Sequence, residues 1–114
     1  MPHLIDTHSH LDAPIFERDL DIVVNHARLD DIWTVTVGND YASSQKAVAI
    51  AEKHEGVYAA IGLHPARVPE DISADDKLLN LEKFAELARH PKVVAIGECG
   101  LDYHDLADEG RRQT

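Results

Sequence analysis

The hydrophobic positions along the chain follow two repeating patterns, which predict strands and helices in alternation. Apolar runs at 3–8, 31–38, 57–62 and 92–97 have the length and the β-branched or aromatic composition of buried strands. Between these runs, apolar residues recur three or four positions apart, which is the spacing of a helix with one buried face. The pattern predicts four strands separated by three helices.

Each predicted helix has a stripe of apolar residues that would face the sheet. The stripes consist of Phe16, Leu20, Val23, Val24 and Ala27 in the first, Ala47, Ile50 and Ala51 in the second, and Leu78, Leu81, Phe84, Ala85 and Ala88 in the third. Strands and helices in strict alternation are typical of α/β proteins with a parallel sheet and right-handed crossovers. With 114 residues, the chain is expected to form a single domain over 1–114.

The charge balance limits the partners that the surface could bind. Lys and Arg number 11 against 21 Asp and Glu, giving a net charge of −10 with neutral histidines. This balance argues against capture of nucleic acid by a broad basic surface. A phosphate substrate is still compatible with it, because a bound divalent cation reverses the local field.

Two absences bear on the compartment. No run of about 18 apolar residues and no basic segment followed by an apolar one is present, so neither a membrane span nor an export signal is predicted. Cys99 is the single cysteine, which excludes an intrachain disulfide and fits a cytoplasmic protein. We expect its thiol to pack as a small apolar group.

Polar residues collect where the predicted strands end. "DTHSH" follows the first strand, "GLHP" the third and "GECGLDY" the fourth. In parallel α/β folds this carboxyl edge of the sheet is where ligands bind. The sequence therefore predicts a binding site at this edge.

A metal site is the chemistry that these residues favour. Alternation along a strand places Asp6, His8 and His10 on one side, so both imidazoles could reach one cation while Asp6 accepts the other ring N–H. Two ligands do not complete a site, and an isolated H-x-H is usually a pair of polar residues at a strand end. Glu98 is a candidate third ligand, because a carboxylate directly after a buried strand requires exposure or a partner, and a cation is one such partner.

Three other residues are candidates to bind substrate. His64 stands at a strand end before Pro65, although a loop histidine bonded to backbone has the same pattern. Asp102 and Tyr103 could bind substrate or water, or form a turn and a packing aromatic. Four other histidines are expected at the surface or as helix caps, and they are His3, His26, His54 and His90.

The segments "IDTHSHLD", "IGLHP" and "AIGECGLDYH" resemble, in order and spacing, the signature segments of the TatD family of metal-dependent deoxyribonucleases, within the amidohydrolase-like metallohydrolases. Three ordered motifs are far more specific than an H-x-H pair. The resemblance implies a TIM-type (β/α)8 barrel with about eight βα units, of which this chain would supply the N-terminal half, four strands and three helices.

The resemblance also implies hydrolysis of DNA phosphodiester bonds with one or two divalent ions, of zinc, manganese, magnesium or nickel. His8 and His10 would bind one ion, and Glu98 would be the catalytic carboxylate that bridges to a second. His64, Asp102 and Tyr103 would lie against the substrate. The family's other ligands, two histidines and an aspartate that is the expected general base, come from later strands. We therefore expect the 114 residues alone to cleave DNA weakly or not at all.

Two other functions stay open at this point. The same metal chemistry serves hydrolysis of small cyclic amides or lactones, since a fold does not fix a substrate. Alternatively, the chain is a non-catalytic, metal-binding half-barrel. The two unpaired sheet edges of a half-barrel would also favour self-association.

Overall fold

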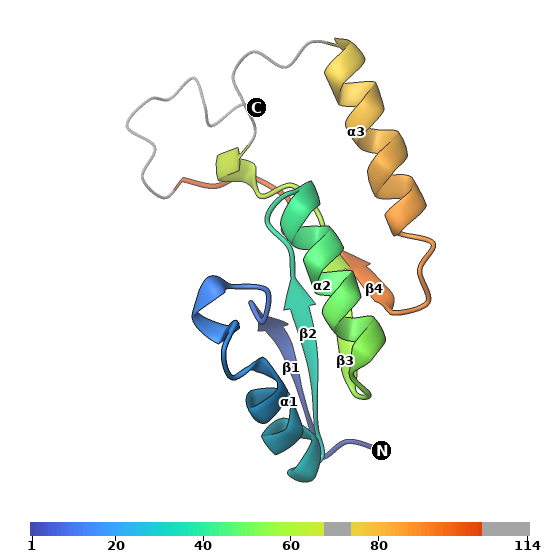
Figure 1. The fold of residues 1–114 in the computed structure, drawn as a ribbon. Helices are drawn as coiled ribbons and strands as arrows, with labels where there is room; N and C mark the ends of the chain where they lie inside the picture. The colour runs from blue at the N-terminus through green and yellow to red at the C-terminus, as the bar shows by residue number, and fades with distance from the viewer. Residues whose placement is uncertain (68–73, 104–114) are drawn as a thin grey trace.

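The computed structural model describes residues 1–67 and 74–103, and of residues 74–80 it describes the backbone. Four strands form one sheet in the order β1-β2-β3-β4, and all three neighbouring pairs are parallel. The strands are β1 (Leu4–Ser9), β2 (Ile32–Val37), β3 (Val57–Ile61) and β4 (Val93–Ile96). Figure 1 shows that all four point the same way, which confirms the predicted parallel α/β arrangement.

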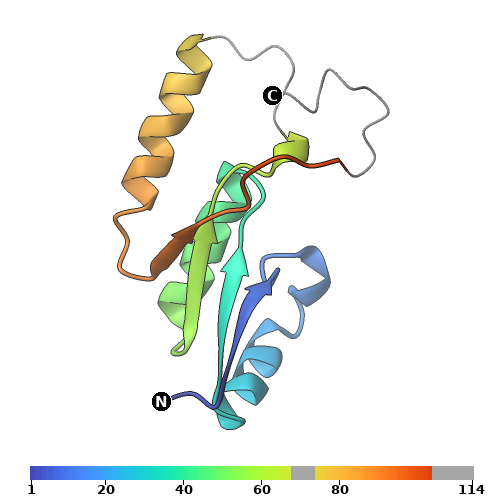
Figure 2. The ribbon, with the colours of Figure 1, turned by 180° about the vertical axis from the view of Figure 1, so that it is seen from behind.

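The helices connect successive strands. They are α1 (Leu20–Leu29), α2 (Tyr41–Lys53) and α3 (Ala74–Leu87), with short 3-10 turns η1 (Pro14–Phe16) and η2 (Pro65–Arg67). Phe16 belongs to η1, so the predicted first helix is two separate elements. Helices α1 and α2 lie against one face of the sheet, whereas no helix among the described residues covers the other face (Figure 2).

The core lies between α2 and the two central strands. Ala47 and Ala51 of α2 and Ala59 and Ile61 of β3 are completely buried. Small side chains at this contact let the helix backbone approach the sheet closely, and burial of apolar surface is the main favourable term in folding. The apolar stripe predicted for the second helix is confirmed.

The stripe predicted for the third helix is only partly correct. Phe84, Leu87 and Ala88 pack against the core, but Leu81 is 66% exposed and Ala85 is exposed as well. Helix α3 lies at the β4 end of the sheet (Figure 1). Its neighbouring helix there is α2, on one side only, so a narrower strip of α3 is buried than the sequence predicts. The side chain of Leu78 is outside the described residues.

The outer strands are not the buried strands that their apolar sequences predict. Leu4 of β1 is 65% exposed and Ile96 of β4 is 64% exposed. Each outer strand has a neighbouring strand on one side only, and one face of the sheet is uncovered in the described residues (Figure 2). Apolar side chains there have no surface to pack against.

Helix α2 begins with a capping box. The Asp40 carboxylate accepts a hydrogen bond from the Ser43 backbone N–H at 2.8 Å, and the Ser43 hydroxyl accepts one from the Asp40 backbone N–H at 2.9 Å. The backbone and side-chain hydrogen bonds from Ser43, and after them the charge of Arg67, hold the pKa of Asp40 below its ordinary value of 3.8 despite its partial desolvation. The ionised carboxylate therefore favours the folded state.

Replacement of this cap should lower stability in a pH-dependent way. Asp40→Ala should reduce the free energy of unfolding by about 1 kcal/mol at neutral pH. Since the folded-state pKa lies below 3.8, this contribution is fully present above pH 3.8 and is lost as the pH falls through the folded-state value. Urea unfolding at a series of pH values measures it. The control is Asp19→Ala, because Asp19 caps α1 without a side-chain hydrogen bond; an equal loss there would contradict the interpretation.

A second pair of variants tests the location of the core. Ile61→Ala removes a fully buried side chain and should cost about 2–5 kcal/mol of unfolding free energy. Leu81→Ala removes a side chain that is 66% exposed and should change the unfolding free energy by less than about 0.5 kcal/mol. Equal losses in urea unfolding would show that α3 packs more extensively than described.

Candidate metal centre

Three segments that are far apart in the sequence meet at the carboxyl edge of the sheet. His8 Nε2 lies 2.8 Å from Glu98 Oε1, and His10 Nε2 lies 3.9 Å from the same oxygen. The other carboxylate oxygen, Glu98 Oε2, lies 3.1 Å from His64 Nε2. The structure thus brings together His8 and His10 from the end of β1, His64 from the loop after β3 and Glu98 from the segment after β4.

Irregular strand pairing precedes both sets of ligands. On β1 the register passes from Asp6 opposite Thr34 to Ser9 opposite Thr36, so β1 advances three residues while β2 advances two. A similar shift occurs on β4, shortly before Glu98. Irregularities of this kind change the direction of nearby side chains and are common beside functional sites. The strict alternation assumed for residues 6 to 10 does not hold, yet both imidazoles face Glu98.

Gly62 allows the loops that carry His64 and Glu98 to approach each other. A Cβ at Gly62 would lie 2.5 Å from the carbonyl oxygen of Gly97, which is shorter than any real contact of this kind. The Gly97 backbone N–H also donates a hydrogen bond to the Ile61 carbonyl at 2.9 Å. The glycine in "IGLHP" is therefore required by the close approach of the two strand ends, whereas a Cβ at Gly97 would meet nothing within 4 Å.

The hydrogen bonds of His10 fix which of its nitrogens has a free lone pair. Its Nδ1 lies 2.8 Å from the carbonyl oxygen of Val37. A carbonyl can only accept, so Nδ1 carries the proton, and in the neutral ring Nε2 presents a lone pair towards Glu98 Oε1. A lone pair and a carboxylate oxygen that face each other at 3.9 Å suit a cation between them.

His64 has the opposite tautomer. The backbone N–H of Ala66 donates to His64 Nδ1 at 3.1 Å, so in the neutral ring the proton is on Nε2. That nitrogen lies 3.1 Å from Glu98 Oε2 and 4.0 Å from Asp102 Oδ2. The ring of His64 therefore lies close to the carboxylate of Glu98, and it also has the backbone hydrogen bond expected of an ordinary loop histidine.

The spacing of the three potential ligands fits a small divalent cation. One ligand atom from each of His8, His10 and Glu98 can be chosen so that all three lie within 4.8 Å of one another. With metal–ligand bonds of about 2.1 Å in a tetrahedron, neighbouring ligand atoms are about 3.4 Å apart. The proton that His8 Nε2 shares with Glu98 would be replaced by the ion. Imidazole nitrogen with carboxylate oxygen suits zinc, manganese or nickel and, less well, magnesium.

Asp6, Tyr103 and Cys99, which were also singled out in the sequence, lie close along the chain to residues of the cluster. Asp6 accepts a hydrogen bond from the backbone N–H of His8 at 3.1 Å, whereas the sequence predicted that it would hold an imidazole ring. In its place, the Val37 carbonyl holds the ring of His10. Tyr103 follows Asp102 directly and is exposed at this edge. Cys99 is an exposed thiol, so the prediction that it packs internally is wrong.

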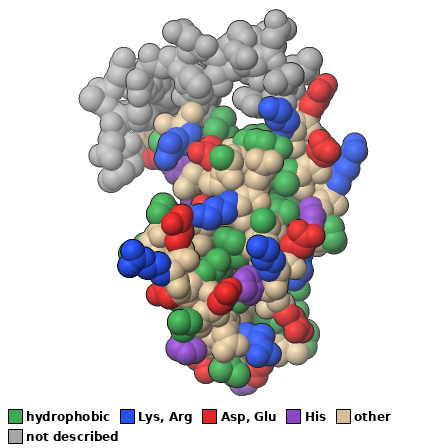
Figure 3. All heavy atoms as spheres, in the orientation of Figure 1, with side chains coloured by type: hydrophobic (Ala, Val, Ile, Leu, Met, Phe, Trp, Pro, Cys, Tyr) green, Lys and Arg blue, Asp and Glu red, His purple; other side chains and the backbone are tan. Residues whose placement is uncertain are grey.

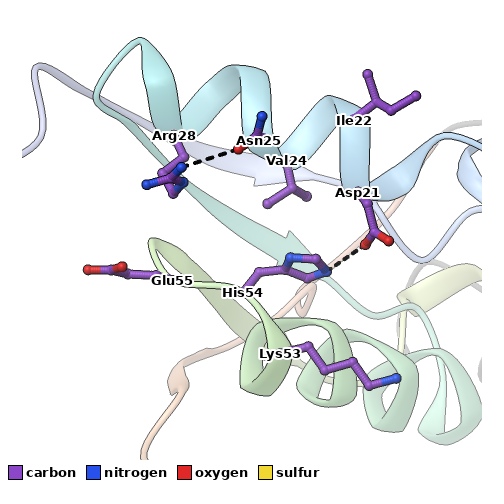
Figure 4. A pocket seen from close by; sticks show the side chains of 8 residues that line it. All are labelled: Asp21, Ile22, Val24, Asn25, Arg28, Lys53, His54 and Glu55. Atoms are coloured by element: carbon purple, nitrogen blue, oxygen red, sulfur yellow. Dashed lines mark hydrogen bonds and ion pairs between the residues drawn. The ribbon is translucent and has the colours of Figure 1, made fainter.

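A pocket of about 550 Å³ lies elsewhere, between α1 and the end of α2 (Figure 4). His54, the residue that ends α2, points into it and pairs with Asp21 at 3.3 Å. None of the residues that line the pocket belongs to the cluster around Glu98. His54 is therefore a capping residue, as its sequence position suggested.

The surface over α1, α2 and α3 carries mixed charge. Figure 3 shows Lys and Arg side chains interspersed with Asp and Glu on this face, without one broad basic patch. This distribution agrees with the net charge of −10. None of the helices that the structure describes has the length and apolar character needed to cross a membrane.

Comparison with known proteins identifies relatives of the chain. Residues 5–114 match the family model described as TatD related DNase. The uncharacterized metal-dependent hydrolase YabD of Bacillus subtilis is 41% identical over 102 residues, which cover 89% of this chain and 38% of the relative. The human deoxyribonuclease TATDN3 is 32% identical over 105 residues, which cover 88% of this chain and 38% of the relative.

A solved structure agrees with these matches. The crystal structure of YjjV, a TatD homologue from Escherichia coli, superimposes with a TM-score of 0.75 and 32% identity over 96% of this chain and 41% of that one. The chain spans about two fifths of the length of the proteins that it matches. Its four parallel βα strands correspond to part of the TIM-type barrel of these proteins, and the chain belongs to the TatD-related family of metal-dependent hydrolases.

Proposed function

We propose that His8, His10 and Glu98 bind a divalent cation, and that this site hydrolyses phosphodiester bonds of DNA as in a TatD-like deoxyribonuclease. The observation that carries the proposal is the convergence of three potential ligand atoms within 4.8 Å. The lone pair of His10 Nε2, which faces a carboxylate oxygen rather than a donor, supports it further. The human relative is named a deoxyribonuclease, which supports DNA as the substrate.

The residues around the ion would divide the remaining tasks. A bound cation supplies positive charge beside a phosphate and lowers the pKa of water that it holds. Glu98 has a second oxygen, Oε2, which could bridge to a second cation or stay paired with His64 Nε2. The Nε2–H of His64 is a donor for a phosphate oxygen, and Asp102 and Tyr103 extend the same edge of the site.

Two expectations about the surroundings belong to this proposal. The exposed apolar residues of the outer strands, such as Leu4 and Ile96, would favour self-association of the isolated 114 residues through the sheet edges. The single cysteine, Cys99, has an exposed thiol, which fits a reducing compartment such as the cytoplasm.

Metal binding is the first property to measure. Titration of the chain with zinc or manganese in a calorimeter should show one site, and His8→Ala with His10→Ala should weaken it by at least about tenfold, because it loses two of three ligands. The control is His26→Ala, which removes an exposed histidine of α1. Unchanged stoichiometry and affinity in the double variant would contradict the assignment to β1.

The substrate can be tested in a complete barrel. Residues 5–102 of this chain, placed in the human relative in exchange for the matching segment, should give an enzyme that cleaves DNA when loaded with metal and stops when a chelator is added. Glu98→Gln in the same chimera should lower the rate by at least about a hundredfold, since it removes a ligand charge. A folded, metal-binding chimera that hydrolyses a cyclic amide or lactone but not DNA would favour the amidohydrolase alternative. Binding without any hydrolysis would favour a non-catalytic site.

A further inference from the structure

The loop that follows β1 is attached to β2 by hydrogen bonds at three consecutive residues. The His10 ring donates from Nδ1 to the Val37 carbonyl at 2.8 Å, and the Leu11 backbone N–H donates to Thr36 Oγ1 at 3.1 Å. The carboxylate of Asp12 accepts a hydrogen bond from the Thr36 hydroxyl at 3.4 Å. Each residue of the segment 10–12 therefore has a hydrogen-bond partner on β2.

The direction of these bonds follows from the groups involved. A backbone N–H can only donate, so Thr36 Oγ1 accepts from Leu11, and the single hydroxyl proton of Thr36 is left for Asp12. The ionised form of Asp12 can only accept. Thr36 is thus a relay with one arrangement of its hydroxyl, which a residue without a hydroxyl cannot provide.

Burial makes this arrangement rigid. Thr36 is completely buried and Asp12 is 8% exposed, beside the core residue Leu11. A buried polar group that loses its partner is destabilised by its desolvation, so the loop has a strong preference for the one conformation that satisfies all three bonds. In that conformation the backbone of His10 has a fixed position, and the ring Nδ1 can donate its hydrogen bond to the Val37 carbonyl.

We propose that Thr36 and Asp12 are positioning residues for His10, holding its imidazole in the tautomer whose Nε2 lone pair faces Glu98. The inference rests on the metal site proposed above and extends it to residues that do not touch the ion. Groups that orient a metal ligand in this way are typically worth 10-fold to 100-fold in affinity. A purely structural role for the same pair would change stability and leave the ligand geometry alone.

The tautomer is the direct readout and requires no variant. Long-range proton–nitrogen correlation spectra of the metal-free chain, recorded at mildly alkaline pH, should show the proton of the His10 ring on Nδ1. Thr36→Val should convert His10 to a mixture of tautomers, whereas Thr36→Ser, which keeps the hydroxyl, should retain the Nδ1 form. A proton on Nε2 in the unmodified chain would overturn the proposal, whether or not any metal binds.

Metal affinity provides the second readout. In zinc titrations Thr36→Val should bind about 10-fold to 100-fold more weakly, and Thr36→Ser should bind within about threefold of the unmodified chain. The matched control is Thr34→Val, which makes the same change two residues earlier in β2, opposite Asp6 and away from the loop. Equal zinc affinity in folded Thr36→Val and Thr34→Val would overturn the proposal. If Thr36→Val does not fold, the tautomer of the unmodified chain and the serine variant still decide the outcome.

Discussion

Parallel pairing of the four strands is the constraint on which the site depends. Because every strand runs in the same direction, the segments after β1, β3 and β4 all leave the sheet at one edge. An antiparallel neighbour would place one of these segments at the opposite edge, beyond the reach of any side chain. The close backbone contact between Gly62 and Gly97 then narrows the distance between the last two segments until His64 reaches Glu98.

The electrostatics of the cluster follow from the assignment of protons to individual nitrogens. His64 accepts a hydrogen bond from the backbone at Nδ1 and has its Nε2 near the carboxylate. His10 donates from Nδ1 to a backbone carbonyl, so in the neutral ring its Nε2 has a lone pair on the side of the carboxylate. Glu98 therefore faces His8 and His10 with one oxygen and His64 with the other. In the proposed function, the cation would lie on the side of His8 and His10, and the side of His64 would be left for a substrate anion.

The fold around the site is well packed at its centre and exposed at its outer strands. Helix α2 and β3 hold the completely buried residues, while β1 and β4, which carry three of the four clustered residues or their loops, are the strands with exposed apolar side chains. In a TIM-type barrel every strand has two neighbours and the inner face is filled by side chains. The relatives, of which this chain covers about two fifths, have that architecture.

The sequence by itself determined the order of strands and helices, the buried face of α2 and the residue types available for metal chemistry, because these follow from periodicity and from the chemistry of single side chains. It was unable to determine the burial of β1, β4 and α3. An apolar pattern shows that a side chain is suited to a buried position, but it does not show whether another element packs against that side chain. The same limit applies to Asp6, whose place on the strand suggested a bond to an imidazole that the irregular pairing of β1 directs elsewhere. Only the tertiary structure decided which nitrogen of His10 is free and that Val37, Thr36 and Asp12 lie around the His10 segment, because those contacts join residues more than 20 positions apart and depend on strand register.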